Sequence, residues 1–330
     1  MKSKLLFLCK NRSSESYDSG RIGLYNSAVF ASNALKPHFD TVLEVCIDGN
    51  CLDKFVTKHK PDYVIIEAIF VEPKKLRELV KLHPSVTWVV RIHSKIPFLA
   101  NEGIALDWCG QYEKIPNVHL CGNNKDFVDD MYKVGYECIY LPNLYTEKPH
   151  DIKYVKSTNM LNVSCLGAIR PMKNTLIQAV AALSFAGRID KYLRFHINAS
   201  RTEQNGSNVL KNLRALFDNN KGWGQLVEHQ WMDQTDLNEL ISRMDIGMQV
   251  SYSESYNLVA AQHIVNDVPI VTSGEVQINT SWLHADPNST DDIEAKLKRA
   301  YYFGGTFGVL SKHKLDKANK AAITQWTDTL

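Results

Sequence analysis

Short apolar runs alternate with longer amphipathic stretches through the first half of the chain. Compact apolar runs are typical of buried strands, and apolar residues at intervals of three and four indicate helices. This pattern predicts strands over residues 5–9, 41–47, 63–66, 87–92, 118–121 and 138–141. It predicts helices over residues 24–35, 52–59, 73–82 and 126–134. Such regular alternation is typical of an open parallel sheet with helices on both faces.

A second alternation follows a polar, charged stretch, where we predict a linker over residues 146–158. Strands are predicted over residues 161–166, 193–197, 226–229, 246–250 and 269–272. Helices are predicted over residues 175–186, 208–217, 234–244 and 257–265, with two further helical patterns over 291–302 and 314–326. The domains would then be 1–145 and 159–312, and the segment 313–330 would be a C-terminal helix that could pack back on the first domain. The expected fold class is α/β, with two Rossmann-like domains that face each other across a cleft.

Composition narrows the class of protein without naming a partner. The 330 residues include 44% hydrophobic and 22% charged residues, which is average for a globular protein. A formal net charge of +2 is too small to indicate a nucleic-acid binder by itself. Seven cysteines without metal-ligand spacing are typical of reduced thiols in a cytosolic protein. The sequence shows neither a signal peptide nor an apolar run of membrane-spanning length, so we expect no membrane partner and a cytoplasmic location.

The segment from Leu166 to Asn174 joins a predicted strand to a predicted helix, with Asn174 as the expected N-cap. Open α/β sheets bind ligands at the carboxyl ends of their strands. Gly167 permits close backbone approach, the helix start offers free N–H groups, and Arg170 and Lys173 add positive charge. This combination suits a diphosphate. A solvated basic turn before an ordinary helix would look the same.

A second segment, residues 251–262, lies between the predicted strands 246–250 and 269–272. Glu254 would lie in a loop before a helix and could accept hydrogen bonds from sugar hydroxyls. Gln262, within that helix, could bond the hydroxyls of a ribose. The alternative is that Glu254 only complements the helix dipole and that Gln262 lies on the surface.

The run from Glu254 to Gln262, with the strand that follows, resembles the Glu-x7-Glu motif of the retaining glycosyltransferases with GT-B fold. The loop from Gly167 to Lys173 is similar to the diphosphate loop of that group. Residues 161–275 match the group in order and spacing, and the N-terminal half matches it much less. The sequence departs from the group at three places. Gln262 replaces the second glutamate, Asn174 replaces the glycine after the lysine, and Ser255 and Asn257 stand where glycines are common.

The resemblance implies transfer of a sugar from a nucleotide-sugar co-substrate with retained anomeric configuration. Arg170 and Lys173 would neutralise the departing diphosphate with help from the backbone N–H groups of Asn257 and Leu258. Trp231 and Met232, after the predicted strand 226–229, would face the nucleotide base. The chain contains no Asp-x-Asp, so we expect a reaction without a metal ion and with no bound cofactor.

The N-terminal half offers weaker candidates for the acceptor side. His93 resembles a position where related enzymes often carry a histidine that touches the transferred sugar, although a histidine bonded to nearby backbone is an equal alternative. Arg91 and Lys95 could face an anionic acceptor or could simply be solvated. Gly20 and Gly23 follow the first strand and could line the same cleft.

The acceptor itself is open. Residues 88–103 resemble glycosyltransferases of large tailed bacteriophages, for which a hydroxymethylated pyrimidine in phage DNA is a frequent acceptor. Such a base would have to leave the stack, and the protein would then lie in the host cytoplasm. Basic residues could hold DNA phosphates, namely Lys74, Lys75, Arg77, Lys81, Arg91 and Lys95. A solvated helix face is the commoner reason for such lysines. Transfer to a glycan or a small molecule, a nucleotide-sugar 2-epimerase and a non-catalytic nucleotide-sugar-binding protein are the alternative functions.

Overall fold

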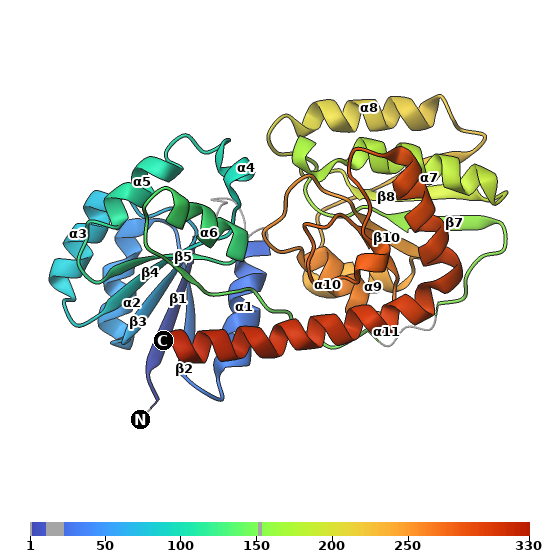
Figure 1. Ribbon diagram of the computed structural model, residues 1–330. Coiled ribbons are helices and arrows are strands. Elements are labelled where there is room, and N and C mark those ends of the chain that lie inside the picture. The colour runs from blue at the N-terminus through green and yellow to red at the C-terminus, as the bar shows by residue number, and fades with distance from the viewer. Residues whose placement is uncertain (1, 11–22, 151–153) are drawn as a thin grey trace. The chain divides into compact units, whose positions relative to one another are not determined.

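The computed structural model of the protein describes residues 2–10, 23–150 and 154–330. The chain divides into two compact units (Figure 1). Unit 1 comprises residues 1–146 and 319–330, and unit 2 comprises residues 147–318. The division before unit 2 falls where the composition turns polar, and the last residues of the chain belong to unit 1.

Unit 1 is built on a parallel sheet with the strand order β2-β1-β3-β4-β5-β6. Its strands are β1 (Lys4–Lys10), β2 (Asp40–Cys46), β3 (Tyr63–Glu67), β4 (Thr87–Ile92), β5 (Val118–Gly122) and β6 (Cys138–Tyr140). Its helices are α1 (Gly23–Leu35), α2 (Leu52–His59), α3 (Pro73–Leu82), α4 (Ile96–Leu99), α5 (Ala105–Tyr112) and α6 (Lys125–Lys133). At least one helix separates each pair of successive strands, which is the connection that parallel pairing requires.

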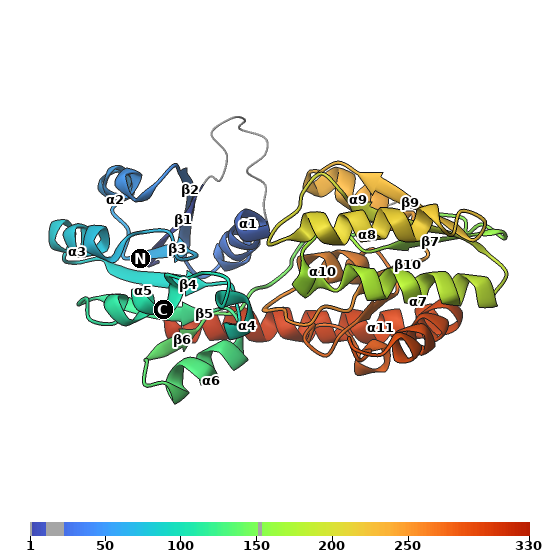
Figure 2. The ribbon, with the colours of Figure 1, turned by 90° about the horizontal axis from the view of Figure 1, so that it is seen from above.

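Alternate residues of the unit 1 strands face two separate cores. Leu6 and Leu8 of β1 pack in the core that α2, α3, α5 and α6 cover. Leu5 and Phe7 pack on the other face with α1 and with Trp326 near the end of the chain. Figures 1 and 2 show α2 and α3 on one side of this sheet and α1 on the other. Burial on both faces explains why the strands read as continuous apolar runs.

Unit 2 repeats the architecture with the strand order β11-β10-β7-β8-β9. Its strands are β7 (Met160–Ser164), β8 (Tyr192–Asn198), β9 (Gly224–His229), β10 (Ile246–Gln249) and β11 (Ile270–Thr272). Its helices are α7 (Thr175–Arg188), α8 (Gly206–Asp218), α9 (Gln234–Ser242), α10 (Leu258–Val265) and the first part of α11 (Thr290–Thr329). All of its strand pairs are parallel.

The two faces of the unit 2 sheet differ in polarity. Leu161 and Val163 of β7 pack in an apolar core with α7, α8 and α11. The alternating residues Asn162 and Ser164 are also buried but point to the opposite face, because successive strand residues alternate. There the Ser164 hydroxyl lies 2.7 Å from Nε2 of His263 in α10. One face of this sheet is therefore held by hydrogen bonds as well as by apolar packing.

Apart from the C-terminal helices, the predicted elements all fall on observed ones, with ends that differ by up to two residues. Helices α4 and α5 were not predicted. Two C-terminal helices were predicted, and α11 joins two helices across a kink at Phe303 (φ −125°, ψ 18°), directly after the first predicted helix ends. Residues 304–313 are also helical, which was not predicted. Gly304, Gly305 and Gly308 weaken the helical signal there. Gly304 is needed for packing, since a Cβ at this position would lie 2.7 Å from the Pro269 ring.

Candidate functional site

The loop after β7 leaves its backbone open at Gly167. This residue has φ +112°, a conformation that favours glycine, and an added Cβ would meet no atom within 4 Å. Its N–H donates to the Asn198 side chain at 2.8 Å, which fixes the loop to the end of β8. The space beside the Gly167 backbone is therefore open, and the approach of a ligand to it stays a prediction.

Asn174 precedes α7, as expected, but it does not cap the helix with its side chain. Its backbone is left-handed (φ 57°, ψ 29°), which asparagine tolerates better than most residues. Its Nδ2 donates to the carbonyls of Val250 at 3.1 Å and Pro287 at 2.8 Å. Asn174 is thus the N-cap residue of α7, as predicted, but its amide ties the loop to the end of β10 instead of bonding the first turn of the helix.

The segment after β10 is organised by Asn257. Its Oδ1 accepts the N–H of Ala260 at 2.8 Å and so caps α10, whereas its Nδ2 donates to Gln249 at 2.8 Å. The Asn257 side chain is thus occupied by the fold, and only its backbone N–H and that of Leu258 stay candidates for phosphate contact. Gln262 lies one turn further in and is 2% exposed. The alternative that Gln262 lies on the surface is therefore wrong.

The loops after β7 and β10 contact each other at Lys173 and Glu254. The Lys173 ammonium donates to the Glu254 carboxylate in a short ion pair. Their side chains are 17% and 6% exposed, so water screens the pair little. The backbone N–H of Tyr252 also donates to the Met172 carbonyl at 3.0 Å. Two segments that are 81 residues apart in the sequence therefore form one site.

The second predicted phosphate ligand, Arg170, pairs with a carboxylate that the sequence analysis missed. Its Nη1 lies 3.3 Å from Glu203, which also accepts from Arg201. The Arg201 guanidinium lies 4.6 Å from the centre of the Trp231 ring, a cation–π contact. Trp231 therefore stacks on a cation, and its indole Nε1 is buried without a hydrogen-bond partner. Glu203 could have been suspected, since it follows β8 at the edge where ligands bind.

Two further predicted donor contacts are half-buried. Met232 follows Trp231 in the loop after β9, and Ser255 follows Glu254 in the loop after β10. Both loops leave the carboxyl ends of parallel strands, and so does the Gly167 loop. The predicted donor residues thus share one edge of the unit 2 sheet. Among the described residues, no three His, Cys, Asp or Glu side chains form a group that could hold a metal ion.

In unit 1, His93 follows β4 and belongs to a buried charged network with Glu67, the last residue of β3, and Arg91 of β4. Its Nε2 makes a short contact with Glu67, and Arg91 Nη1 lies 3.1 Å from both carboxylate oxygens. Burial favours a neutral Glu67, but attraction to Arg91 and the hydrogen bond from His93 outweigh it and lower the pKa of Glu67. Burial lowers the pKa of His93, against the opposing effect of Glu67. An ionised Glu67 only accepts, so neutral His93 carries its proton on Nε2.

Arg91 cannot face an acceptor. Its side chain is fully buried, donates to the Leu141 carbonyl at 2.9 Å and lies 5.1 Å from the centre of the Trp326 ring. The prediction that Arg91 faces the acceptor was therefore wrong. Its charge is instead compensated inside the unit by the buried Glu67 carboxylate. Glu67 itself ends an apolar strand, a position from which its role could have been suspected.

The other unit 1 candidates are less constrained. Lys95 is 12% exposed in its side chain and pairs with Asp126 at 2.6 Å. Gly23 is the exposed first residue of α1, and Gly20 lies outside the described residues. Lys74 and Lys81 of α3 are exposed and Lys75 is half-buried, while Leu76 and Leu79 face the core, as in an ordinary solvated amphipathic helix.

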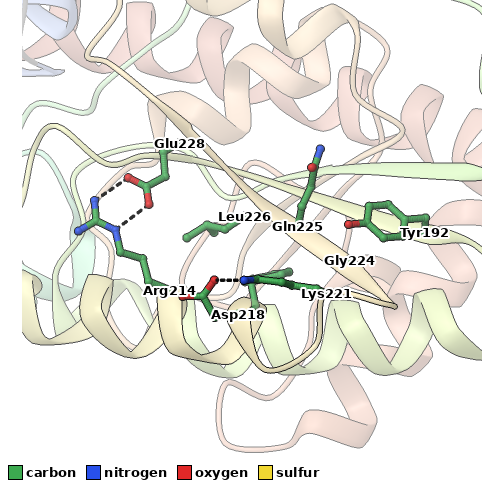
Figure 3. A pocket seen from close by; sticks show the side chains of 9 residues that line it. Tyr192, Arg214, Asp218, Lys221, Gly224, Gln225, Leu226 and Glu228 are labelled. Atoms are coloured by element: carbon green, nitrogen blue, oxygen red, sulfur yellow. Dashed lines mark hydrogen bonds and ion pairs between the residues drawn. The ribbon is translucent and has the colours of Figure 1, made fainter.

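A pocket of about 550 Å³ lies elsewhere in unit 2, between α8 and β9 (Figure 3). Figure 3 shows its charged side chains in two ion pairs, Arg214 of α8 with Glu228 of β9, and Lys221 with Asp218 at the end of α8. The pocket runs along the edge strand β9 from Gly224 to Glu228 and also includes Tyr192, the first residue of β8. This pocket contains none of the predicted site residues.

Comparisons with solved structures identify the architecture. Sucrose-phosphate synthase from Thermosynechococcus elongatus matches with a TM-score of 0.69 and 10% identity over 99% of this chain and 98% of that chain. A UDP-forming α,α-trehalose-phosphate synthase from Burkholderia xenovorans matches with a TM-score of 0.66 and 11% identity, covering 100% and 98%. The chain has the GT-B fold. The fold that the sequence predicted is confirmed.

A third match is a trehalose-6-phosphate structure from E. coli bound with UDP-2-fluoro glucose, with a TM-score of 0.66 and 12% identity over 99% of this chain and 97% of that chain. By sequence, neither a family model nor a characterised protein matches the chain. Among the residues that the structure of this protein describes, no helix is long and apolar enough to cross a membrane.

Proposed function

We propose that the protein is a glycosyltransferase that moves a sugar from a nucleotide-sugar donor to a hydroxyl acceptor with retention and without a metal ion. The observation that carries this proposal is the contact of Lys173 with Glu254. It joins the predicted diphosphate loop to the predicted sugar loop at the carboxyl edge of a GT-B sheet. A solvated basic turn and a helix-capping glutamate would not need to meet there.

The residues of this site could supply the chemistry of the donor side. Breaking the bond between the sugar C1 and the phosphate oxygen places negative charge on the diphosphate, which Lys173 and Arg170 would stabilise. The acceptor oxygen forms the new bond to C1 from the leaving-group face, and its proton passes to a phosphate oxygen of the leaving group. Glu254 would hold the sugar through its hydroxyls. The role of His93 in touching that sugar stays a prediction.

Uridine nucleotides are the first donors to test. One structure of the same fold was bound with UDP-2-fluoro glucose, and another is described as UDP-forming. At the identities involved, the likeness carries the fold alone, so the base of the donor needs its own measurement. Gln262 would meet the ribose through an amide that can donate as well as accept.

The acceptor is the second open part of the proposal. A hydroxymethylated pyrimidine in DNA stays a hypothesis drawn from the sequence, and the burial of Arg91 removes one of the cations that would hold DNA phosphates. A glycan or a small molecule is the alternative acceptor. Absence of both salt-sensitive DNA binding and transfer to hydroxymethylcytosine DNA would refute the DNA hypothesis.

A thermal-shift screen tests the donor site directly. Nucleoside diphosphates and nucleotide sugars should raise the melting temperature, since a ligand that binds only the folded state stabilises it. Lys173→Ala and Arg170→Ala should abolish the shift, whereas Lys221→Ala, at the opposite end of the unit 2 sheet, should leave it intact. A shift that persists in both site variants would mean that the diphosphate binds elsewhere.

Product analysis separates the proposed transferase from its rivals. Incubation with the nucleotide sugar that gives the largest shift should release nucleoside diphosphate slowly by hydrolysis. An epimerised nucleotide sugar would instead identify a 2-epimerase. Donor binding without transfer, hydrolysis or epimerisation would identify a non-catalytic binding protein.

A further inference from the structure

Both cations of the predicted diphosphate site are already engaged by carboxylates. Lys173 pairs with Glu254, and Arg170 lies 3.3 Å from Glu203. A diphosphate that enters the site must compete with these carboxylates for the same ammonium and guanidinium groups. The two pairs differ in one respect, because Glu254 is also the predicted partner of the sugar hydroxyls and Glu203 is not.

The burial of Glu254 decides what this competition costs. The residue is 7% exposed, so water cannot replace the ammonium if Lys173 turns towards a phosphate. A buried carboxylate without a cation or hydrogen-bond donors is strongly unfavourable. Glu254 accepts from Lys173 and has a neighbouring carboxylate, Glu275, which accepts from its backbone N–H at 3.5 Å. A second negative group close by makes an uncompensated Glu254 still less favourable.

We propose that Glu254 makes this site select an intact nucleotide sugar over the free nucleoside diphosphate. With a nucleotide sugar, the hydroxyls of the sugar donate to Glu254 while Lys173 moves to the diphosphate, so both charges stay compensated. With the nucleoside diphosphate alone, Lys173 must share its three N–H donors between the phosphates and Glu254, and no sugar hydroxyl makes up for the weakened contact at the carboxylate. This cost weakens the binding of the nucleoside diphosphate product and so favours its release after sugar transfer. This inference rests on the proposed function of the site.

The test compares the binding of donor and product in Glu254→Gln. Glutamine keeps the shape of the side chain and removes the charge that holds Lys173. Calorimetric titrations would use UDP with UDP-glucose, GDP with GDP-mannose and ADP with ADP-glucose, and would continue with the pair that binds the wild type. We expect Glu254→Gln to bind the nucleoside diphosphate about tenfold more tightly, the order expected for releasing one charged hydrogen bond. Its affinity for the nucleotide sugar should rise less, so the preference for the sugar should fall.

Two controls isolate the ion pair. Glu275→Gln removes a charge of the same sign next to Glu254 without removing the group that Lys173 contacts in the pair. It should change the preference far less than Glu254→Gln. Inorganic pyrophosphate, which lacks both base and sugar, should also bind Glu254→Gln more tightly than the wild type, and Lys173→Ala should cancel that gain.

The outcomes separate this inference from the proposed function. If the wild type binds a nucleotide sugar but Glu254→Gln gains no affinity for the diphosphate, the inference is wrong and the donor site stands. An equal gain in Glu275→Gln would also overturn it, because general repulsion would then explain the effect. If neither protein binds any nucleotide or pyrophosphate, the donor site itself is misplaced and both proposals fall.

Discussion

The buried His263 makes unit 2 sensitive to mild acid. Its Nδ1 lies 2.7 Å from the Val259 carbonyl and its Nε2 lies 2.7 Å from the Ser164 hydroxyl. Nδ1–H therefore donates and Nε2 accepts, which defines a neutral ring. Burial lowers the pKa of His263 to about 4, whereas a histidine in an unfolded chain has a pKa of about 6.5.

The sign follows from which state binds the proton. Between about pH 6.5 and about pH 4 the unfolded chain protonates this histidine and the folded chain does not, so the free energy of unfolding falls as the pH falls. At about 1.36 kcal/mol per pKa unit, the complete loss is about 3.4 kcal/mol below pH 4. Between about pH 7.5 and about pH 5 the loss from His263 is about 2 kcal/mol.

Urea unfolding of the wild type and of His263→Gln at the two pH values measures this contribution. Burial also lowers the pKa of His196, to about 3, so the wild type should lose more than the His263 share. The difference between the two proteins isolates that share, and His263→Gln should lose about 2 kcal/mol less on acidification. The exposed His119 supplies the control His119→Gln, which should behave as the wild type. An equal loss in wild type and His263→Gln would refute the reasoning.

Three further predictions concern the packing around the two sheets. Gly247→Ala should lower the free energy of unfolding by about 1–3 kcal/mol, because its Cβ would lie 2.3 Å from His263, and chemical denaturation measures this. Asn174→Ala should be about 1 kcal/mol less stable than Asn174→Gly, since both lose the amide contacts but only alanine is strained at φ 57°; equal stabilities would contradict the backbone argument. Arg91→Met should cost about 3–5 kcal/mol by stranding Glu67, and adding Glu67→Leu should restore part of it in the same assay.

The sequence predicts the architecture well because the fold depends on local patterns. Strands buried on both faces produce continuous apolar runs, and each helix shows its buried stripe. The central part of α11 escapes detection for a physical reason. Gly304 appears there because the helix packs against Pro269, a contact between residues 35 positions apart that no local pattern reveals.

The candidate site is predicted less completely, because its partners come from different loops. Lys173 and Glu254 were each predicted as ligand-binding residues, but their contact depends on the strand order that places β10 beside β7. Arg91 shows the opposite failure. A basic residue at a strand end looks like a ligand-binding residue until the neighbouring strand supplies Glu67 and burial removes the arginine from solvent.

The structure also separates the departures from the Glu-x7-Glu pattern into two kinds. Asn174 keeps the left-handed backbone that a glycine would allow, and its amide adds contacts to the end of β10. Asn257 caps α10 and bonds Gln249. Both substitutions thus serve the fold. The hydrogen bond that Gln262 accepts from Asn266 uses its backbone carbonyl, so the fold does not account for its side chain in the same way. If this site binds a nucleotide sugar, Gln262 is where a difference in donor recognition should arise.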